Sequence, residues 1–261
     1  MDTSSIFGVL IAVGGIIAGL LFEGGSIGQI LQPTAALIVF GGTMGAVLLQ
    51  YPLKTVVAAF RKLARVFTAP HKANTSYIRQ LIDYAYKARR GGVVSLDAEL
   101  EGIRDPFLRQ ALMLAVDGTE PAELRRIMQV ALNSSAEADD RLPAVFESAG
   151  GFSPTIGILG AVLGLIQVMQ HLDNITEVGR GIAVAFVATI YGVGAANLFF
   201  LPAAGKLRLR HQEEHQRHEM ILEGVISILE GMNPRMLEIK LNGFFVPSGK
   251  QPERDIHQRA A

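Results

Sequence analysis

Residues 151–170 read GFSPTIGILGAVLGLIQVMQ, a run that contains no Asp, Glu, Lys, Arg or His. Twenty residues of α-helix rise about 30 Å, which matches the thickness of the hydrocarbon core of a bilayer. A helix buried in a soluble protein rarely lacks every charge over such a length. The run therefore predicts a membrane-spanning helix.

Three further runs have the same character, at residues 5–22, 33–52 and 181–204. The first follows only Asp2, with no basic residue before it, so we interpret it as a retained span and not as a cleaved signal. We expect an all-α membrane protein with four transmembrane helices. A cytoplasmic helical bundle would lie between the second and third spans, and a long helix would extend the fourth.

The predicted domains follow from these spans. They are residues 1–52 with two spans, 53–150 as a cytoplasmic helical domain, 151–204 with two more spans, and 205–261 as a cytoplasmic helix and mobile tail. The composition agrees, with 49% hydrophobic residues, 18% charged residues and a mean hydropathy of +0.32. The net charge of zero gives no bias toward nucleic acid, and the absence of Cys excludes thiolate chemistry.

The distribution of Lys and Arg predicts the orientation. The short connections at residues 23–32 and 171–180 contain one basic residue, Arg180, and the other 23 of the 24 lie between residues 51 and 150 or after residue 204. Both termini and the large loop should therefore face the cytoplasm. Membrane lipid then surrounds the four spans.

The spans contain no ionisable acid or base, although ion translocation usually needs one at membrane depth. Their hydroxyls and amides can solvate an ion but cannot carry a proton near neutral pH. A partner must then supply the acid. No phosphate-binding loop or nucleophile elbow is present, and His211 to His215 spell H-x-x-E-H without a recognisable third zinc ligand, so we predict no enzyme activity.

Glycines spaced four residues apart suggest close helix packing, at Gly15 with Gly19, Gly41 with Gly45 and Gly160 with Gly164. Each single pair is explained equally well by the abundance of Gly in membrane spans. Pro154 is expected to begin the third span and Pro202 to close the fourth. Their spacing alone favours ordinary helix-end prolines over functional bends.

Smaller signals mark helices outside the spans. Gly91-Gly92 should end a helix whose apolar face includes Ile78 and Leu81, and Asp105-Pro106 should cap and begin the next helix. Asn233-Pro234 should end the helix that extends the fourth span.

Several of these stretches together resemble one known family. They are residues 151–165 (GFSPTIGILGAVLGL), residues 185–202 (AFVATIYGVGAANLFFLP), residues 88–97 (ARRGGVVSLD) and residues 233–235 (NPR). In this order, and over residues 1 to about 245, they resemble the flagellar stator A subunits, MotA and PomA.

The resemblance implies a stator of the bacterial inner membrane. In that family a homopentamer of A subunits surrounds two B subunits of the MotB or PomB type, whose single spans carry the ion-binding Asp. The third and fourth spans of A line the ion path. The matching ion-path or partner-facing residues are Pro154, Gly157, Ala161, Ala188, Thr189, Tyr191 and Pro202.

The resemblance also implies a contact between the A subunit and the rotor switch protein FliG. Arg89 matches the basic and Asp97 the acidic residue of that contact, with Arg90, Glu99 and Glu101 nearby. A solvated helix face is the ordinary explanation of such charges. Charge reversal would distinguish the two, because a stator would lose torque and keep its assembly.

The resemblance bears on the translocated ion as well. Sodium-driven relatives carry hydroxyls where this sequence has Ala161 and Ala188, while Thr189 keeps the hydroxyl found in both types. Sodium needs several oxygen ligands in place of its water, and two methyl groups remove two of them. We therefore expect proton use, with no metal and no other cofactor.

Other functions stay open at this point. An energiser of envelope transport like ExbB or TolQ would belong to the same superfamily, but those relatives typically have three spans. A gliding motor or a second stator set would share the mechanism. A passive membrane scaffold would use the polar residues of the spans only for packing.

Overall fold

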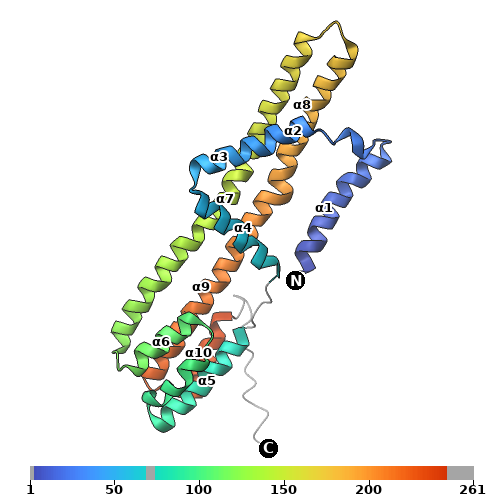
Figure 1. The fold of residues 1–261 in the computed structure, drawn as a ribbon. Helices are drawn as coiled ribbons and strands as arrows, with labels where there is room; N and C mark the ends of the chain where they lie inside the picture. Colours follow the sequence, from blue (N-terminus) through green and yellow to red (C-terminus); the bar gives the residue numbers. More distant parts are fainter. Residues whose placement is uncertain (1–2, 69–73, 246–261) are drawn as a thin grey trace, which may run out of the picture. The chain divides into compact units, whose positions relative to one another are not determined.

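The computed structural model describes residues 3–68 and 74–245, and every regular element within these ranges is helical (Figure 1). The all-α prediction is confirmed. The chain forms two compact units, one made of Met1–Pro70 with Glu137–His211 and the other of His71–Ala136 with Gln212–Ala261. The domain boundaries drawn from the sequence stay predictions, and the tail after residue 245 lies outside the described residues.

The first unit contains the apolar helices. In chain order its elements are α1 (Thr3–Phe22), η1 (Ile27–Gln29), α2 (Pro33–Ala36), the π-helical η2 (Leu37–Gly41), α3 (Gly42–Gln50), α4 (Leu53–Thr68), the second part of α7 (Pro121–Gln170), α8 (Ile175–Ala195), the π-helical η4 (Ala196–Phe200) and the first part of α9 (Leu201–Leu229).

Three helical stretches of the described residues are long and apolar enough to cross a membrane, at Pro33–Gln50, Pro121–Gln170 and Ile175–Leu229. The stretch Phe7–Phe22 within α1 is a shorter apolar helix. Among the described residues, membrane-spanning candidates are therefore present in three of the four apolar regions of the sequence, and the fourth region forms a shorter apolar helix.

Helix α7 differs from the prediction, because it runs unbroken over 50 residues with Pro143 and Pro154 inside it. Pro154 therefore lies inside a helix and does not begin one. A proline removes one helical hydrogen bond, and packing on both sides can hold the helix together. Val145 and Phe146 are buried before Pro154, and Gly157 is buried after it.

The core of the first unit near this proline joins α4, α7 and α9, with Val47 of α3 and Phe200 of η4 at its edge. The buried faces of α4, α7 and α9 supply Val56, Ala59, Leu63, Val145, Phe146, Ala149, Ala203, Ala204 and Leu207. The edge-to-face contact between the rings of Phe60 and Phe146, with centroids 5.0 Å apart, adds to this core. Pro202 lies in the first turn of α9 and is exposed.

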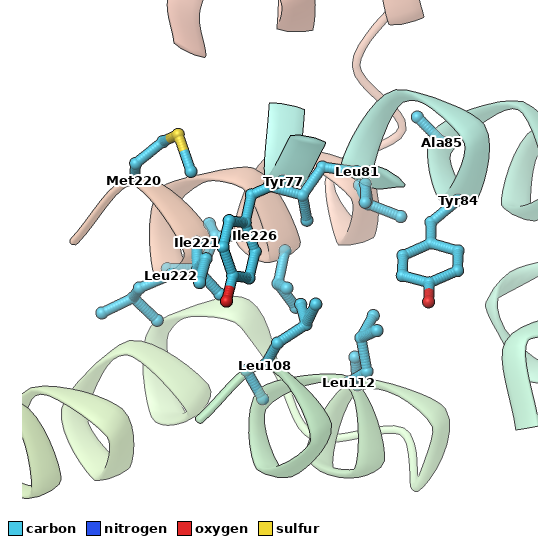
Figure 2. Close-up of a cluster of buried hydrophobic side chains, with 14 of the residues drawn as sticks. Tyr77, Leu81, Tyr84, Ala85, Leu108, Leu112, Met220, Ile221, Leu222 and Ile226 are labelled. Atoms are coloured by element: carbon cyan, nitrogen blue, oxygen red, sulfur yellow. The ribbon is translucent and has the colours of Figure 1, made fainter. Parts of the chain in front are cut away.

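The second unit is a helical bundle with its own core. It contains α5 (Asn74–Gly91), η3 (Val93–Gly102), α6 (Pro106–Val116), α10 (Pro234–Asn242), η5 (Gly243–Phe245), the first part of α7 and the last part of α9. Figure 2 shows side chains from α5, α6 and α9 meeting in this core: Tyr77, Leu81, Tyr84, Ala85, Leu108, Leu112, Met220, Ile221, Leu222 and Ile226. The predicted apolar face of α5 is confirmed.

Local sequence signals set most boundaries in this unit. The Asp105 carboxylate accepts hydrogen bonds from the backbone N–H groups of Phe107 and Leu108, as an N-cap does. Helix α5 ends at Gly91, as predicted. Helix α9 ends at Leu229, before the predicted stop, because Gly231 adopts a positive φ of 72°. The Asn233 side chain instead caps α10.

Candidate functional site

Helices α7 and α8 approach so closely that their glycines leave no room for a side chain. A Cβ on Gly157 would lie 2.9 Å from the carbonyl oxygen of Ala188, and one on Gly192 would lie 2.6 Å from that of Ser153. Two turns further along α7, a Cβ on Gly164 would lie 2.7 Å from the carbonyl oxygen of Gly181. Contact between backbones requires glycine at these positions.

Of the three glycine pairs for which close helix packing was predicted, one lies in this contact. A Cβ on Gly160 would lie 2.8 Å from the Ala188 Cβ, so Gly160 and Gly164 both serve the contact between α7 and α8. Among the described residues, no atom lies within 4 Å of a Cβ built on Gly15, Gly19, Gly41 or Gly45.

The structure separates the predicted ion-path residues by exposure. Gly157 and Ala188 are buried between helices of one chain, and Ala188 has no exposed surface. Pro154, Ala161, Thr189 and Tyr191 are half-buried, and Pro202 is exposed. A hydroxyl at position 188 would therefore enter a packed helix contact and not an open surface of this chain.

The two hydroxyls of α8 within this group are engaged by backbone oxygens. The Thr189 hydroxyl donates to the carbonyl oxygen of Ala185 at 3.2 Å, one turn earlier. The Tyr191 hydroxyl donates to the carbonyl oxygen of Ile30 at 2.6 Å and accepts from the backbone N–H of Gln32 at 3.3 Å. Tyr191 thus attaches α8 to the segment that leads into α2.

Two other hydroxyls are buried without such a partner. Ser153 on α7 has no exposed surface and Thr43 on α3 is 2% exposed, and neither side-chain oxygen has a hydrogen-bond partner among the described residues. Burying a hydroxyl without a partner costs free energy. These two hydroxyls are therefore unsatisfied polar atoms inside the apolar unit.

The predicted rotor-contact residues lie on one continuous segment of the second unit. Arg89 and Arg90 occupy the last turn of α5, and the three acidic residues, Asp97, Glu99 and Glu101, lie on η3. Gly92, with a φ of 78°, makes the turn between the two elements. Leu96 has no exposed surface and anchors η3 to the core.

Most of these charges are available to a partner. Glu99 binds the Lys87 ammonium at 2.6 Å, and this hydrogen bond raises the pKa of Lys87. The other four, Arg89, Arg90, Asp97 and Glu101, are exposed, and none of them forms an ion pair with another residue of the described ranges. Exposed charges of both signs suit the steering of a partner.

No group of three His, Asp or Glu side chains within residues 3–68 and 74–245 could hold a metal ion. The spans contain no Asp, Glu, Lys, Arg or His side chain. The structure therefore offers packed apolar helices with a few hydroxyls in one unit and a charged surface in the other.

Comparison with known proteins identifies the family. Residues 6–91 match the model of the motility protein A N-terminal domain, and residues 99–220 match that of the MotA/TolQ/ExbB proton channel family. Motility protein A of Bacillus subtilis is 35% identical over 246 residues, which cover 92% of this chain and 90% of that protein. The chain belongs to the motility protein A family.

Solved structures of the family support this assignment. The C. jejuni MotAB structure matches with a TM-score of 0.90 at 32% identity, over 97% of this chain and 98% of that one. The flagellar MotAB stator complex of Bacillus subtilis matches with a TM-score of 0.86 at 34% identity, over 95% and 97% of the two chains. The resemblance stated from the motifs is confirmed.

The sequence analysis did not identify the α8 side of the contact between α7 and α8. Gly181 and Gly192 were not singled out, although they share one helical face with Ala185 and Ala188, at spacings of four, three and four residues. That spacing of small residues would have indicated the contact. The unpartnered state of the Ser153 and Thr43 hydroxyls left no signal in the sequence.

Proposed function

We propose that this protein is the A subunit of a proton-driven flagellar stator, which works with a B subunit that supplies the ion-binding carboxylate. One observation carries the proposal: the spans contain no Asp, Glu, Lys, Arg or His, in a chain that matches MotAB stator structures over nearly its whole length. A proton path through lipid needs such a group. The B subunit would provide it.

The proposal includes a topology of four spans, formed by α1, by α2 to α3, by the second half of α7, and by α8 with η4. Both termini and the second unit would lie in the cytoplasm of the bacterium, with the spans in the inner membrane. The near absence of Lys and Arg from the two short connections supports this orientation. A homopentamer around the B subunits would bring the third and fourth spans of each copy to the ion path.

Proton use is proposed over sodium use. The half-buried Ala161 provides a methyl group where a sodium path would need an oxygen ligand, Ala188 provides another methyl group that is packed between helices, and the Thr189 hydroxyl is already bonded within its own helix. The half-buried Ala161 and Thr189 are the positions where a partner group could reach the path. Swimming speed measured from 0 to 100 mM sodium at constant ionic strength should stay level, and loss of swimming without sodium would refute proton use.

The charged segment from Arg89 to Glu101 is proposed to act on the rotor switch protein FliG. Exposure of both signs of charge on a segment anchored by Leu96 supports this role. Arg89→Glu should reduce torque while the complex still assembles. Arg79→Glu, which reverses an exposed charge ten residues earlier on α5, is the matched control.

The decisive experiment uses vesicles. The full chain reconstituted alone should not conduct protons, whereas the chain together with its B subunit should conduct, and replacing the intramembrane Asp of the B subunit by Asn should abolish conduction. Equal proton flux from the chain alone would contradict the proposal. The match of residues 6–91 to the motility-specific N-terminal domain favours a stator over an energiser of the ExbB or TolQ type.

A further inference from the structure

A pocket of about 590 Å³ opens beside α4, in the first unit. Its volume falls in the range of small-molecule sites, about 300–1,000 Å³. The described residues that line it are Leu53, Lys54, Val57, Ala58, Arg61 and Lys62 of α4 and Leu142 of α7. The lining thus combines three cations with four apolar side chains and includes no acid.

The pocket lies where an apolar helix meets charged sequence. Helix α3 ends at Gln50, and α4 begins three residues later at Leu53. The Tyr51 hydroxyl fixes this corner, because it donates to the carbonyl oxygen of Ala144 on α7 at 3.1 Å. On the proposed topology, this corner is the point at which the second span leaves the hydrocarbon core.

Helix α4 presents two different faces. One face is buried in the core with α7 and α9, through residues such as Val56 and Ala59. The other face leaves Leu53 65% exposed and Val57 39% exposed, beside the cations of the pocket. A helix with apolar and cationic residues on its exposed side is typical of the headgroup region of a membrane.

Two of the three cations are available to an anion. Lys62 contacts the Asp139 carboxylate, with 3.6 Å between Nζ and Oδ1. Lys54 and Arg61 are exposed, and neither forms an ion pair with another residue in the described part of the chain. The charges of Lys54 and Arg61 therefore give the pocket a local positive charge that no acidic side chain of the described residues pairs with.

We propose that this α4–α7 pocket binds the headgroup of an anionic phospholipid. Lys54 and Arg61 would bind the phosphate oxygens, which their ammonium and guanidinium groups match in charge and geometry. Leu53, Val57 and Leu142 would contact the glycerol and the first acyl carbons. Basic pockets beside membrane helices bind anionic headgroups in this way.

The lining favours a lipid over the other occupants. A soluble phosphate ester would leave the three apolar side chains exposed to water, at a cost in free energy. A second copy of the chain would need to place an acidic segment against the two cations. The inference goes beyond the proposed function, since a lipid site at this corner requires no ion conduction.

The test is a lipid titration of the purified full chain by native mass spectrometry. Phosphatidylglycerol and phosphatidylcholine with the same acyl chains are added to separate samples. Phosphatidylglycerol should bind more tightly, and Lys54→Gln with Arg61→Gln should weaken it by roughly fivefold for each charge removed. Binding of phosphatidylcholine should stay unchanged in the same double variant.

Two further variants separate a pocket from a diffuse charge effect. Arg141→Gln removes an exposed cation beside Leu142 that does not line the pocket, and it should change phosphatidylglycerol binding less than twofold. Ala58→Trp keeps every charge but fills the volume, so it should weaken phosphatidylglycerol binding. Thermal unfolding followed by circular dichroism checks that each variant is folded.

Several results would overturn the inference. Equal affinities for the two lipids, an effect of Arg141→Gln as large as the effect per charge of the Lys54→Gln and Arg61→Gln double variant, or no effect of Ala58→Trp would each exclude a headgroup pocket. Displacement of the lipid by an equal concentration of glycerol phosphate would assign the site to a soluble anion. A change of oligomeric mass in the double variant without a change in lipid binding would assign it to a second copy.

Discussion

Replacing Gly192 by Ala should destabilise the contact between α7 and α8. The new Cβ would lie 2.6 Å from the carbonyl oxygen of Ser153, about 0.8 Å inside the 3.4 Å at which ordinary contact begins, and 3.0 Å from the Cα of Gly157. Both neighbours are backbone atoms, so a rotamer change cannot relieve the clash and the helices must separate. Overpacking of this kind costs about 1–3 kcal/mol.

Gly194→Ala on the same helix is the matched control, because nothing in the described residues lies within 4 Å of a Cβ at that position. Ala there should leave stability unchanged or raise it by up to about 1 kcal/mol. Thermal unfolding of the purified chain in detergent, followed by far-ultraviolet circular dichroism, measures both variants. Equal unfolding temperatures for Gly192→Ala, Gly194→Ala and the unmodified chain would refute the backbone contact.

Three more predictions concern single side chains, and the same unfolding measurement checks each of them. Tyr191→Phe keeps the ring and loses both hydroxyl hydrogen bonds, so it should cost about 1–3 kcal/mol, and no loss would contradict the attachment of α8 to the segment before α2. Burial beside Phe107 lowers the pKa of His218, so the unfolded chain takes up a proton at this residue more readily than the folded chain. The free energy of unfolding should therefore keep its full value above pH 6.5 and fall as the pH drops below it. His218→Phe should remove this loss, and an unchanged pH profile in that variant would contradict the prediction. Burial alone would raise the pKa of Glu223, but the hydrogen bonds from Lys240 and Arg125 lower it below its usual value. The contribution of Glu223 to the free energy of unfolding should therefore be present above pH 4.5 and vanish as the pH falls further. Glu223→Gln should lower stability at pH 7 and flatten this part of the pH profile.

The sequence predicted the helical class and the apolar regions because both depend on features that repeat along the chain. Runs without charge mark the spans, and Asp105 caps α6 through a bond to residues two and three positions away. The glycine stop after α5 is equally local. Such features can be recognised before any tertiary contact is known.

The errors lie where distant residues decide the local structure. Pro154 suggested a helix start, but α7 continues through it, and its neighbours Ser153 and Gly157 are buried. Asn233-Pro234 suggested a stop, although the chain had already turned at Gly231. In both cases the same residue types suit two local structures, and contacts with residues distant in the sequence select one of them.

The candidate site was predicted unevenly for the same reason. The charged segment from Arg89 to Glu101 was assigned from the family resemblance, and its rotor contact stays a prediction; the structure places it on the adjacent elements α5 and η3. The engagement of the Tyr191 hydroxyl by a backbone 161 residues away could not be inferred from spacing. The burial of Ala188 depends likewise on Gly160 of another helix.

The π-helical turns at Leu37–Gly41 and Ala196–Phe200 have a consequence for how the gene can change in length. A π-turn accommodates one residue more than an α-turn, so deleting a single codon within Ala196–Phe200 would convert it to regular α-helix and leave the flanking helices facing their present neighbours. The same deletion four residues into α9 would rotate everything beyond it by about 100° and turn Leu207 out of its core. Natural single-codon deletions should therefore be tolerated within Ala196–Phe200 and rejected within α9.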